Sequence, residues 1–248
     1  MRKYILQMVP LVLLSSLCLA ESDYYLSPQM GLSYQNSNID FDPVHGATEK
    51  KRFQSSAIYN LTLGKKIYDD ASLELEIAHA SKHKFSKNVS LEHDYKSADG
   101  RGIRGAQNHN VNAKLTTTSM FANVNYQFKD YLPVSIVPYV LGGIGYSSNK
   151  IGDTILNVTH TSNPDPNSNT LVVPGKKINN FAWQIGAGFL LPITQNLEVN
   201  LSYKFRSLGK IETTNKYNTI LGTATASAPI FKGTLYTSDV LVGLSINF

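Results

Sequence analysis

The chain has 248 residues, of which 42% are apolar and 17% are charged, and its formal net charge is +5. This apolar fraction is ordinary for a folded protein, which excludes disorder as the main state. After residue 20 no apolar run approaches the roughly 18 residues that a spanning helix needs, which excludes a helical membrane protein. The net charge is small for this length, and we expect no nucleic-acid partner.

The start of the chain has the plan of a secretory signal peptide. A basic head precedes an apolar stretch from Ile5 to Leu19, and small residues lie three and one positions before a cut after Ala20. We therefore predict a signal peptide over residues 1–20 and one mature domain over residues 21–248. The mature chain would contain no cysteine, and so no disulfide.

Apolar and polar residues alternate along most of the mature chain. This period of two is typical of strands with one apolar face. Eight segments of about ten residues show it, and each is predicted to be a strand. The segments are 26–35, 56–63, 72–77, 120–128, 136–146, 181–191, 197–206 and 240–248.

An apolar face on every strand fits two architectures. A soluble sandwich or lipocalin-like barrel has that face inside, whereas an outer-membrane barrel has it outside, toward lipid. Charged residues on the polar faces favour the membrane barrel, because opposite charges can pair inside a narrow barrel and stabilise it. Glu198 is expected to pair with Lys204 or Arg206. The charges assigned to the barrel interior are Glu74, Glu76, Glu198, Lys204 and Arg206.

Short and long connections alternate along the chain, and this sets the topology. The predicted short turns are Lys65–Asp70, Lys129–Pro133 and Pro192–Asn196, and the long loops are 36–52, 82–112, 148–179 and 208–237. All long loops then lie at one end, as in bacterial barrels with extracellular loops and periplasmic turns. We predict an all-β fold, an eight-stranded antiparallel up-and-down transmembrane barrel in the bacterial outer membrane. It has four long extracellular loops, three short periplasmic turns and an interior filled by side chains.

Three stretches carry a family resemblance: VPYVLGGIGY (137–146), FAWQIGAGFLLPITQNLEVNLSYKF (181–205) and the terminal LVGLSINF (241–248). They resemble the opacity-protein and outer-membrane-protein-A class of small barrels. The resemblance implies that the terminal aromatic, Phe248, is the address read by the barrel-insertion machinery. The size and the Tyr/Asn/Lys-rich character also resemble the rickettsial surface adhesins, which implies that exposed loops bind host vitronectin.

The second long loop, 82–112, is the most charged, and loops carry function on a rigid scaffold. A basic patch there would dock on an acidic partner: a host protein segment, a sulfated glycan or lipopolysaccharide phosphates. The alternative is a solvated loop whose charges only keep it soluble. The candidate partner-binding residues are Lys82, Lys84, Lys87, Lys96, Arg101 and Arg104.

The predicted function is therefore that of an outer-membrane adhesin, and the alternative is a structural barrel or narrow pore with no dedicated host ligand. We expect a monomer in outer-membrane lipid, with no catalytic residues, no cofactor and no metal site. A lipid A esterase is a minor alternative, because His79 and Ser81 both face lipid and an imidazole can activate a hydroxyl. Glu92 is the nearest loop carboxylate that could orient His79.

Overall fold

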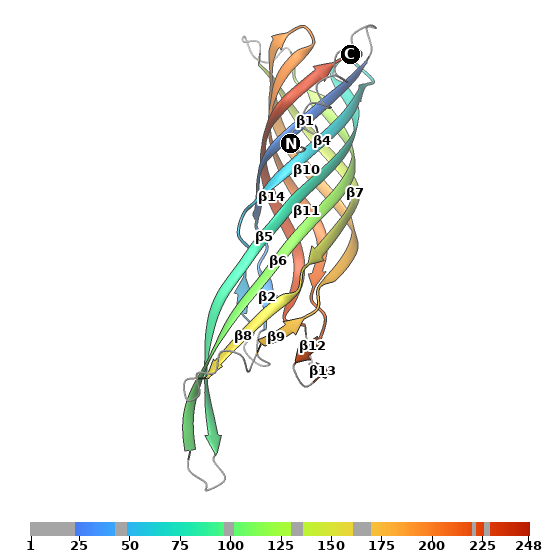
Figure 1. Cartoon of the computed structure of the whole chain (residues 1–248). Coiled ribbons are helices and arrows are strands. Elements are labelled where there is room, and N and C mark those ends of the chain that lie inside the picture. Colours follow the sequence, from blue (N-terminus) through green and yellow to red (C-terminus); the bar gives the residue numbers. More distant parts are fainter. Residues whose placement is uncertain are drawn as a thin grey trace, which may run out of the picture.

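The structure, a computed structural model, describes residues 23–42, 49–96, 102–129, 136–160, 170–219, 222–225 and 229–248. It is built from antiparallel strands (Figure 1). Within the described ranges no helix is long and apolar enough to cross a membrane. Eight long strands form the body of the molecule: β1 (Tyr24–Gln35), β4 (Ser56–Lys66), β5 (Ala71–Lys96), β6 (Gly102–Gln127), β7 (Val137–Ile151), β10 (Lys176–Thr194), β11 (Leu197–Glu212) and β14 (Phe231–Asn247).

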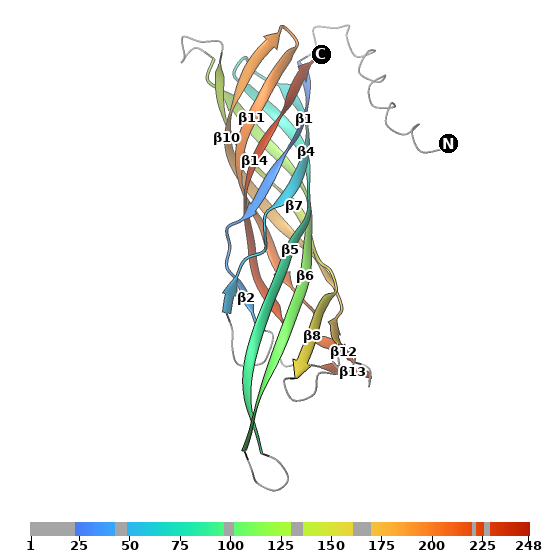
Figure 2. The same ribbon diagram turned by 60° about the vertical axis from the view of Figure 1, so that its left-hand side comes forward.

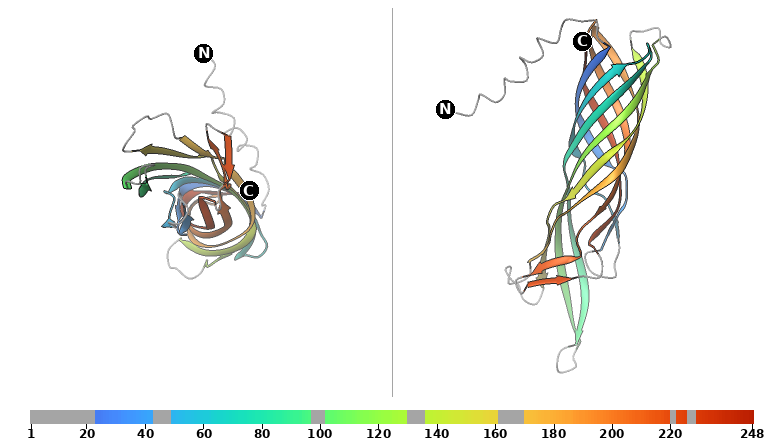
Figure 3. Two further views of the ribbon diagram at one scale, coloured as in Figure 1. Left: turned by 90° about the horizontal axis from the view of Figure 1, so that it is seen from below. Right: turned by 90° about the vertical axis from the view of Figure 1, so that its right-hand side faces the viewer.

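The eight long strands close into a ring. Each pairs with the next in the order β1, β4, β5, β6, β7, β10, β11, β14, and β14 returns to β1. In the closing pair Leu26 lies opposite Ile246, and the Phe248 amide donates a hydrogen bond to the Tyr24 carbonyl at 3.0 Å. The end-on view in Figure 3 shows the closed wall. The predicted eight-stranded up-and-down barrel is confirmed.

The two ends of the barrel differ, as the alternating connections predict. β4 turns into β5 between Lys66 and Ala71, and β10 turns into β11 between Thr194 and Leu197. We call this the turn end; the chain terminus at Phe248 also lies there (Figure 1). The third predicted turn, apart from Lys129 itself, lies outside the described residues. The opposite end carries the long connections, and we call it the hairpin end.

The long connections lie together at the hairpin end, as predicted, but they contain strands where irregular loop was expected. β5 and β6 stay paired as far as Lys96 opposite Gly102, and this ribbon extends well beyond the ring (Figure 2). β8 pairs with β6, and β9, β12 and β13 continue that sheet. The six short strands are β2 (Ile39–Phe41), β3 (Glu49–Lys51), β8 (Thr154–His160), β9 (Thr170–Val173), β12 (Lys216–Thr219) and β13 (Gly222–Thr225).

In the half of the barrel near the turn end, apolar side chains point outward and polar ones inward. Along β5, Leu73, Leu75 and Ile77 are exposed, whereas Glu74 and Glu76 are buried. Successive side chains of a strand point to opposite faces of the sheet. The period of two in the sequence therefore separates the outer surface from the interior directly.

The half near the hairpin end reverses this arrangement, and we call it the head. Along β6, Leu115, Ala113 and Val111 are buried inside, while Lys114 between them is exposed. Four phenylalanine rings pack together, with the centroids of Phe41 and Phe85 4.9 Å apart. The buried apolar residues form one cluster, the head core: Ile39, Phe41, Phe53, Phe85, Val111, Ala113, Leu115, Phe121, Ile151, Leu156, Val173, Ala182, Leu208, Ile211, Ile230, Phe231 and Leu235.

Two β-bulges adjust which side chains enter the head core. Between Ala80 and His83, β5 has one residue more than the β6 segment opposite, and Lys82 adopts a φ of 61°. A regular strand would point Lys82 and Lys84 inward; after the bulge His83 and Phe85 are buried instead. β11 has a corresponding irregularity after Ser207, where Gly209 has a φ of 76° that glycine adopts without strain.

Candidate functional site

An ionic layer crosses the barrel interior. The Glu76 carboxylate accepts hydrogen bonds from Lys204 Nζ at 2.7 Å and from Arg206 Nη2 at 2.6 Å. Arg206 Nη1 also lies 2.6 Å from Asp239 Oδ2. All four side chains are buried. Buried charges are costly unless they are paired and hydrogen-bonded, so this layer favours one arrangement of β5, β11 and β14.

Uncharged polar groups complete the interior. Gln184 Nε2 donates to the Glu76 carboxylate at 3.2 Å, and Gln184 Oε1 accepts from Arg206 Nε at 2.8 Å. Closer to the turn end, the Tyr25 hydroxyl donates to Glu74 at 2.6 Å. These contacts assign Glu74 and Glu76 to a hydrogen-bonded filling of the barrel.

Glu198 does not join the ionic layer. It is half-buried at the mouth of the turn end, where it lines a cavity of about 180 Å³ together with Lys66. The expected pair with Lys204 or Arg206 does not form, because both cations contact Glu76 instead. Lys204 and Arg206 also lie six and eight residues away on the same strand, roughly 20 Å or more at 3.3 Å per residue.

Asp239 is the interior charge that the sequence prediction missed. The predicted last strand begins at residue 240, one position too late to include it. β14 in fact begins at Phe231, and Asp239 points inward with Leu241 and Ser245, which are also buried. Extending the alternation by one residue would have placed this carboxylate inside.

The interior is packed where the ionic layer meets the head core. The Arg206 guanidinium lies over the Phe121 ring, 5.7 Å from its centroid. Leu115 and Leu235, which are fully buried, continue the packing toward the hairpin end. Charged and apolar side chains therefore occupy the barrel axis in successive layers.

The five predicted partner-binding cations that the structure describes do not lie together on the strands. Lys82, on the bulge, and Lys84 are exposed beside the barrel wall. Lys87 pairs with Glu49, which also accepts from Lys51 at 2.8 Å. These two hydrogen bonds lower the pKa of Glu49 to about 2, so the carboxylate stays charged in mild acid.

Lys96 and Arg104 lie farther out. Lys96 ends β5, and Arg104 faces Asp94 across the β5–β6 ribbon. Their side chains, and all of Arg101, lie outside what the structure describes. The ribbon therefore separates Lys96 and Arg104 from Lys82 and Lys84 by at least ten residues of strand, roughly 33 Å.

Among the described side chains, no hydrogen bond joins His79 to Ser81, the proposed esterase pair. His79 Nδ1 lies 2.9 Å from the Thr118 hydroxyl on the neighbouring strand. Glu92 lies thirteen residues beyond His79 along β5, roughly 40 Å away, which is too far to orient the imidazole. Among the residues described, no group of three or more His, Cys, Asp or Glu side chains is placed to hold a metal ion.

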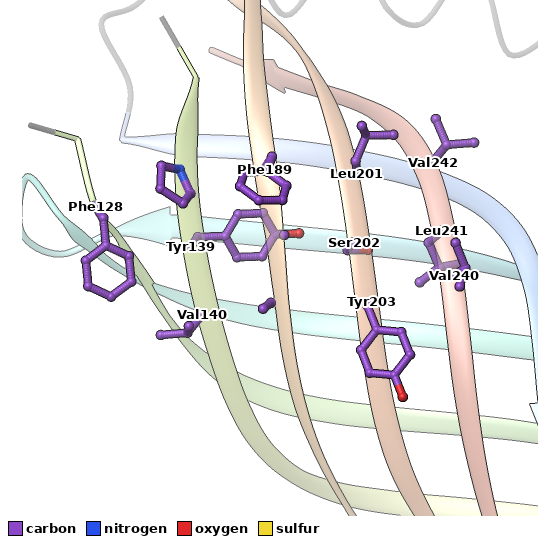
Figure 4. Close-up of a pocket in the computed structure, with 13 residues that line it drawn as sticks. Phe128, Tyr139, Val140, Phe189, Leu201, Ser202, Tyr203, Val240, Leu241 and Val242 are labelled. Atoms are coloured by element: carbon purple, nitrogen blue, oxygen red, sulfur yellow. The ribbon is translucent and has the colours of Figure 1, made fainter. Parts of the chain in front are cut away.

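Shallow grooves mark the outer apolar surface. One of about 600 Å³ crosses β7, β10, β11 and β14, and its lining includes Val140, Phe189 and Val240 (Figure 4). The small Ala187 of β10 also lines it and is paired with Val140 and Tyr203 on the neighbouring strands. A second, of about 590 Å³, includes Met30 and Leu61. Both linings are mostly apolar, which suits lipid acyl chains, and His79 lies at the second groove.

One of the two predicted terminal signals lies within the described residues. Phe248 lies at the end of β14, on the wall of the turn end. Ala20 lies outside the described residues, so cleavage after it stays a prediction.

Comparisons with known proteins agree with this geometry. A family model described as an outer membrane protein beta-barrel domain matches residues 9–248. Outer membrane protein PagN of Salmonella typhimurium is 26% identical over 102 residues, which cover 41% of this chain and 38% of PagN. The chain thus matches well under half of that relative's length.

Two solved structures are similar over most of the chain. Neisserial surface protein A has a TM-score of 0.48 and 9% identity, covering 92% of this chain and 98% of that protein. OprG from Pseudomonas aeruginosa has a TM-score of 0.49 and 12% identity, covering 92% of this chain and 96% of OprG.

Proposed function

Since the chain belongs to the outer membrane protein β-barrel family, with its head outside the cell, we propose that it is an adhesin whose head binds a host or matrix protein. The resemblance to the rickettsial surface adhesins makes vitronectin the first candidate. Adhesion needs no cofactor and no catalytic group, and we propose that the chain acts without either, as a monomer.

The observation that supports adhesion is the folded head. β5 and β6 each have 26 residues, whereas about 9–11 residues of tilted strand cross a membrane. The excess length continues outside the membrane and contributes to an apolar core of its own. A barrel that only spans the membrane needs no packed core outside it, whereas an adhesin needs a rigid surface to present.

The outer part of the β5–β6 ribbon is the best candidate for the contact surface. It projects farthest from the barrel in Figure 1, and it carries Lys96 and Arg104. Lys87 is already paired with Glu49, and Lys84 lies beside the barrel wall. We therefore assign partner binding to Lys96, Arg101 and Arg104.

The test is capture of vitronectin from serum by bacteria that display the protein, with surface expression matched to an empty-vector strain. The wild type is expected to capture vitronectin, and capture should weaken with salt, since exposed charges are screened over about 8 Å at physiological ionic strength. Changing Lys96, Arg101 and Arg104 to Gln should remove most of the capture. The control, in which Lys51, Lys82 and Lys87 become Gln, removes the same charge nearer the membrane and should retain capture.

Two results would reject parts of this proposal. Absence of capture by a correctly inserted wild type would reject vitronectin as the partner. Equal capture by both triple variants would reject the ribbon as the contact surface.

The runner-up functions are a structural barrel without a ligand and a narrow pore. The layered interior supports a closed barrel, and we expect no stable single-channel steps in a planar bilayer; regular steps would favour the pore. We also expect no lipid A ester hydrolysis that depends on His79, which a comparison of the wild type with His79→Ala would check.

A further inference from the structure

Four lysines follow one another around the outer surface of the barrel, just outside its apolar belt. Lys84 is on β5, Lys114 on β6, Lys150 on β7 and Lys177 on β10, which are consecutive strands of the ring. All four side chains point outward and are exposed. We call these residues the lysine row.

The strand register sets these lysines against one another. Lys84 lies directly opposite Lys114, and Lys150 lies directly opposite Lys177. Side chains in such positions have Cβ atoms about 5 Å apart, and like charges there repel each other. None of the four forms an ion pair with another described residue. The row therefore concentrates positive charge that the described protein does not neutralise.

Three other lysines of the described head do form ion pairs. Lys51 and Lys87 pair with Glu49, and Lys176 pairs with Glu212. Lys176 is adjacent in sequence to Lys177 and points to the other face of β10, so the contrast depends on the face rather than on the region of the chain. Among the residues that the structure describes, the opposed unpaired lysines of the row lie on the face that continues the apolar belt.

The row also lies at the right height for lipid headgroups. Lys150 and Lys177 are four residues from the exposed aromatics Tyr146 and Phe181, about 13 Å along each strand and less along the membrane normal because the strands tilt. Polar headgroups begin directly outside the hydrocarbon, and a lysine stem can extend its ammonium several ångströms along the surface. Phosphate groups of outer-leaflet lipids are thus within reach.

We propose that the lysine row binds the phosphate groups of phosphorylated glycolipids in the outer leaflet. One phosphate between each opposed pair would accept charge-assisted hydrogen bonds from both ammonium groups and replace their repulsion with attraction. The site is lateral, on the wall of the barrel, and is distinct from the ribbon assigned to the host partner. It does not depend on the adhesin proposal.

The test compares folded protein in three kinds of vesicle: phosphatidylcholine alone, phosphatidylcholine with diphosphoryl lipid A, and phosphatidylcholine with the same lipid A after dephosphorylation. The melting temperature is read from the heat-dependent gel mobility of the barrel. Diphosphoryl lipid A is expected to raise the melting temperature of the wild type by roughly 2–4 °C relative to the dephosphorylated lipid. The variant with Gln at all four positions should show no rise.

The difference in melting temperature between the Gln variant and the wild type in neutral lipid distinguishes phosphate binding from a general effect on stability. In phosphatidylcholine alone the Gln variant should be as stable as the wild type or more stable, because the opposed charges are gone. Changing the four lysines to Arg should keep the response to lipid A. If the fourfold Gln variant fails to insert, Lys150→Gln with Lys177→Gln is expected to lose about half of the rise, whereas Lys216→Gln with Lys232→Gln, the matched control, should keep it all.

Two outcomes would overturn the proposal. One is an equal rise in the wild type and the Gln variants. The other is an equal rise when inorganic phosphate at the same phosphate concentration replaces lipid A, which would show that the row binds free phosphate rather than a lipid.

Discussion

The membrane half and the head share the same strands but are built by opposite rules. In the membrane half Glu76 and Arg206 face inward and Leu75 faces outward; in the head Leu115 faces inward and Lys114 outward. The change follows the solvent outside the wall, which is lipid around the first half and water around the second. Each strand therefore places its apolar side chains against whichever surroundings are apolar, lipid or its own core.

The two interiors also differ in what holds them together. The membrane half depends on a few charged groups in close contact, with Glu76 shared by two cations. The head depends on the burial of many apolar side chains in one core, so that each contributes only part of the total. A single substitution should therefore damage the first interior through an unpaired charge and the second through a cavity.

Glu76→Ala is expected to have the largest effect. It leaves Lys204 and Arg206 buried with one carboxylate fewer, and removal of one partner from a buried ion pair costs roughly 3–5 kcal/mol. Urea unfolding in vesicles, followed by the fluorescence of Trp183, the single tryptophan, measures the loss. Glu49→Ala, which removes an exposed carboxylate with two lysine partners in the head, is the control and should lower the urea midpoint much less, because exposed ion pairs contribute little to stability. Equal midpoints for both variants would contradict a structural role for the ionic layer.

Leu115→Ala should weaken the head while the membrane half stays folded. Leu115 is fully buried, and a Leu-to-Ala change in a core costs about 3 kcal/mol. Hydrogen exchange should accelerate at the amides of the β5–β6 ribbon but not at amides near Glu76. Thr116→Ala, on the outward face of the same strand, serves as the control. If exchange accelerated uniformly, the two halves would be one cooperative unit.

Substitution of Lys82 tests how the bulge changes which residues of β5 point inward, and a smaller effect on stability is expected. The φ of 61° at Lys82 is the left-handed region, which a β-branched residue adopts only at a cost of roughly 1–2 kcal/mol. Lys82→Val should lower the urea midpoint, whereas Lys82→Gly should leave it unchanged or raise it. A Val variant as stable as the Gly variant would show that the bulge forms elsewhere.

The sequence predicted the membrane half well, and the reason is physical. Lipid and the polar interior differ sharply, so the segment 72–77 alternates without exception and its strand is confirmed within β5. Apolar and polar residues alternate in the head too, as in Val111, Ala113 and Leu115. There the apolar residues are on the inward face, which carries polar residues nearer the turn end. The extra residue at Lys82 and this reversal interrupt the alternation, and these segments were therefore predicted to be loops although they contain strands.

Pairing inside the barrel was not predictable in the same way. Alternation assigns Glu76, Lys204 and Arg206 to the interior, but it does not fix the register between strands that are distant in sequence. The register decides that Glu76, rather than Glu198, meets both cations. Opposed lysines such as Lys150 and Lys177 are likewise visible only once the register is known.

The smallest expected effect is a pH dependence confined to the head. His83 is fully buried, with Nδ1 2.9 Å from the Gln54 carbonyl, and burial lowers its pKa, an effect that the Gln54 carbonyl and the charge of Asp239 partly oppose. An unfolded head would release the imidazole to its ordinary pKa of about 6.5, so the unfolded state binds the proton first as the pH falls. The stability contributed by neutral His83 is therefore complete above pH of about 6.5 and declines below it, through the lowered pKa.

Limited proteolysis of the head measures this decline. It is compared at one pH above 6.5 and one below the lowered pKa of His83, with a protease that is active at both. The wild type should be cleaved faster on the acidic side, and His83→Gln should reduce the difference, because glutamine carries no charge at either pH. The other histidines are present in both proteins, so only the difference between their two pH responses is assigned to His83. Identical pH responses would mean that the head opens in acid for a reason other than this buried imidazole.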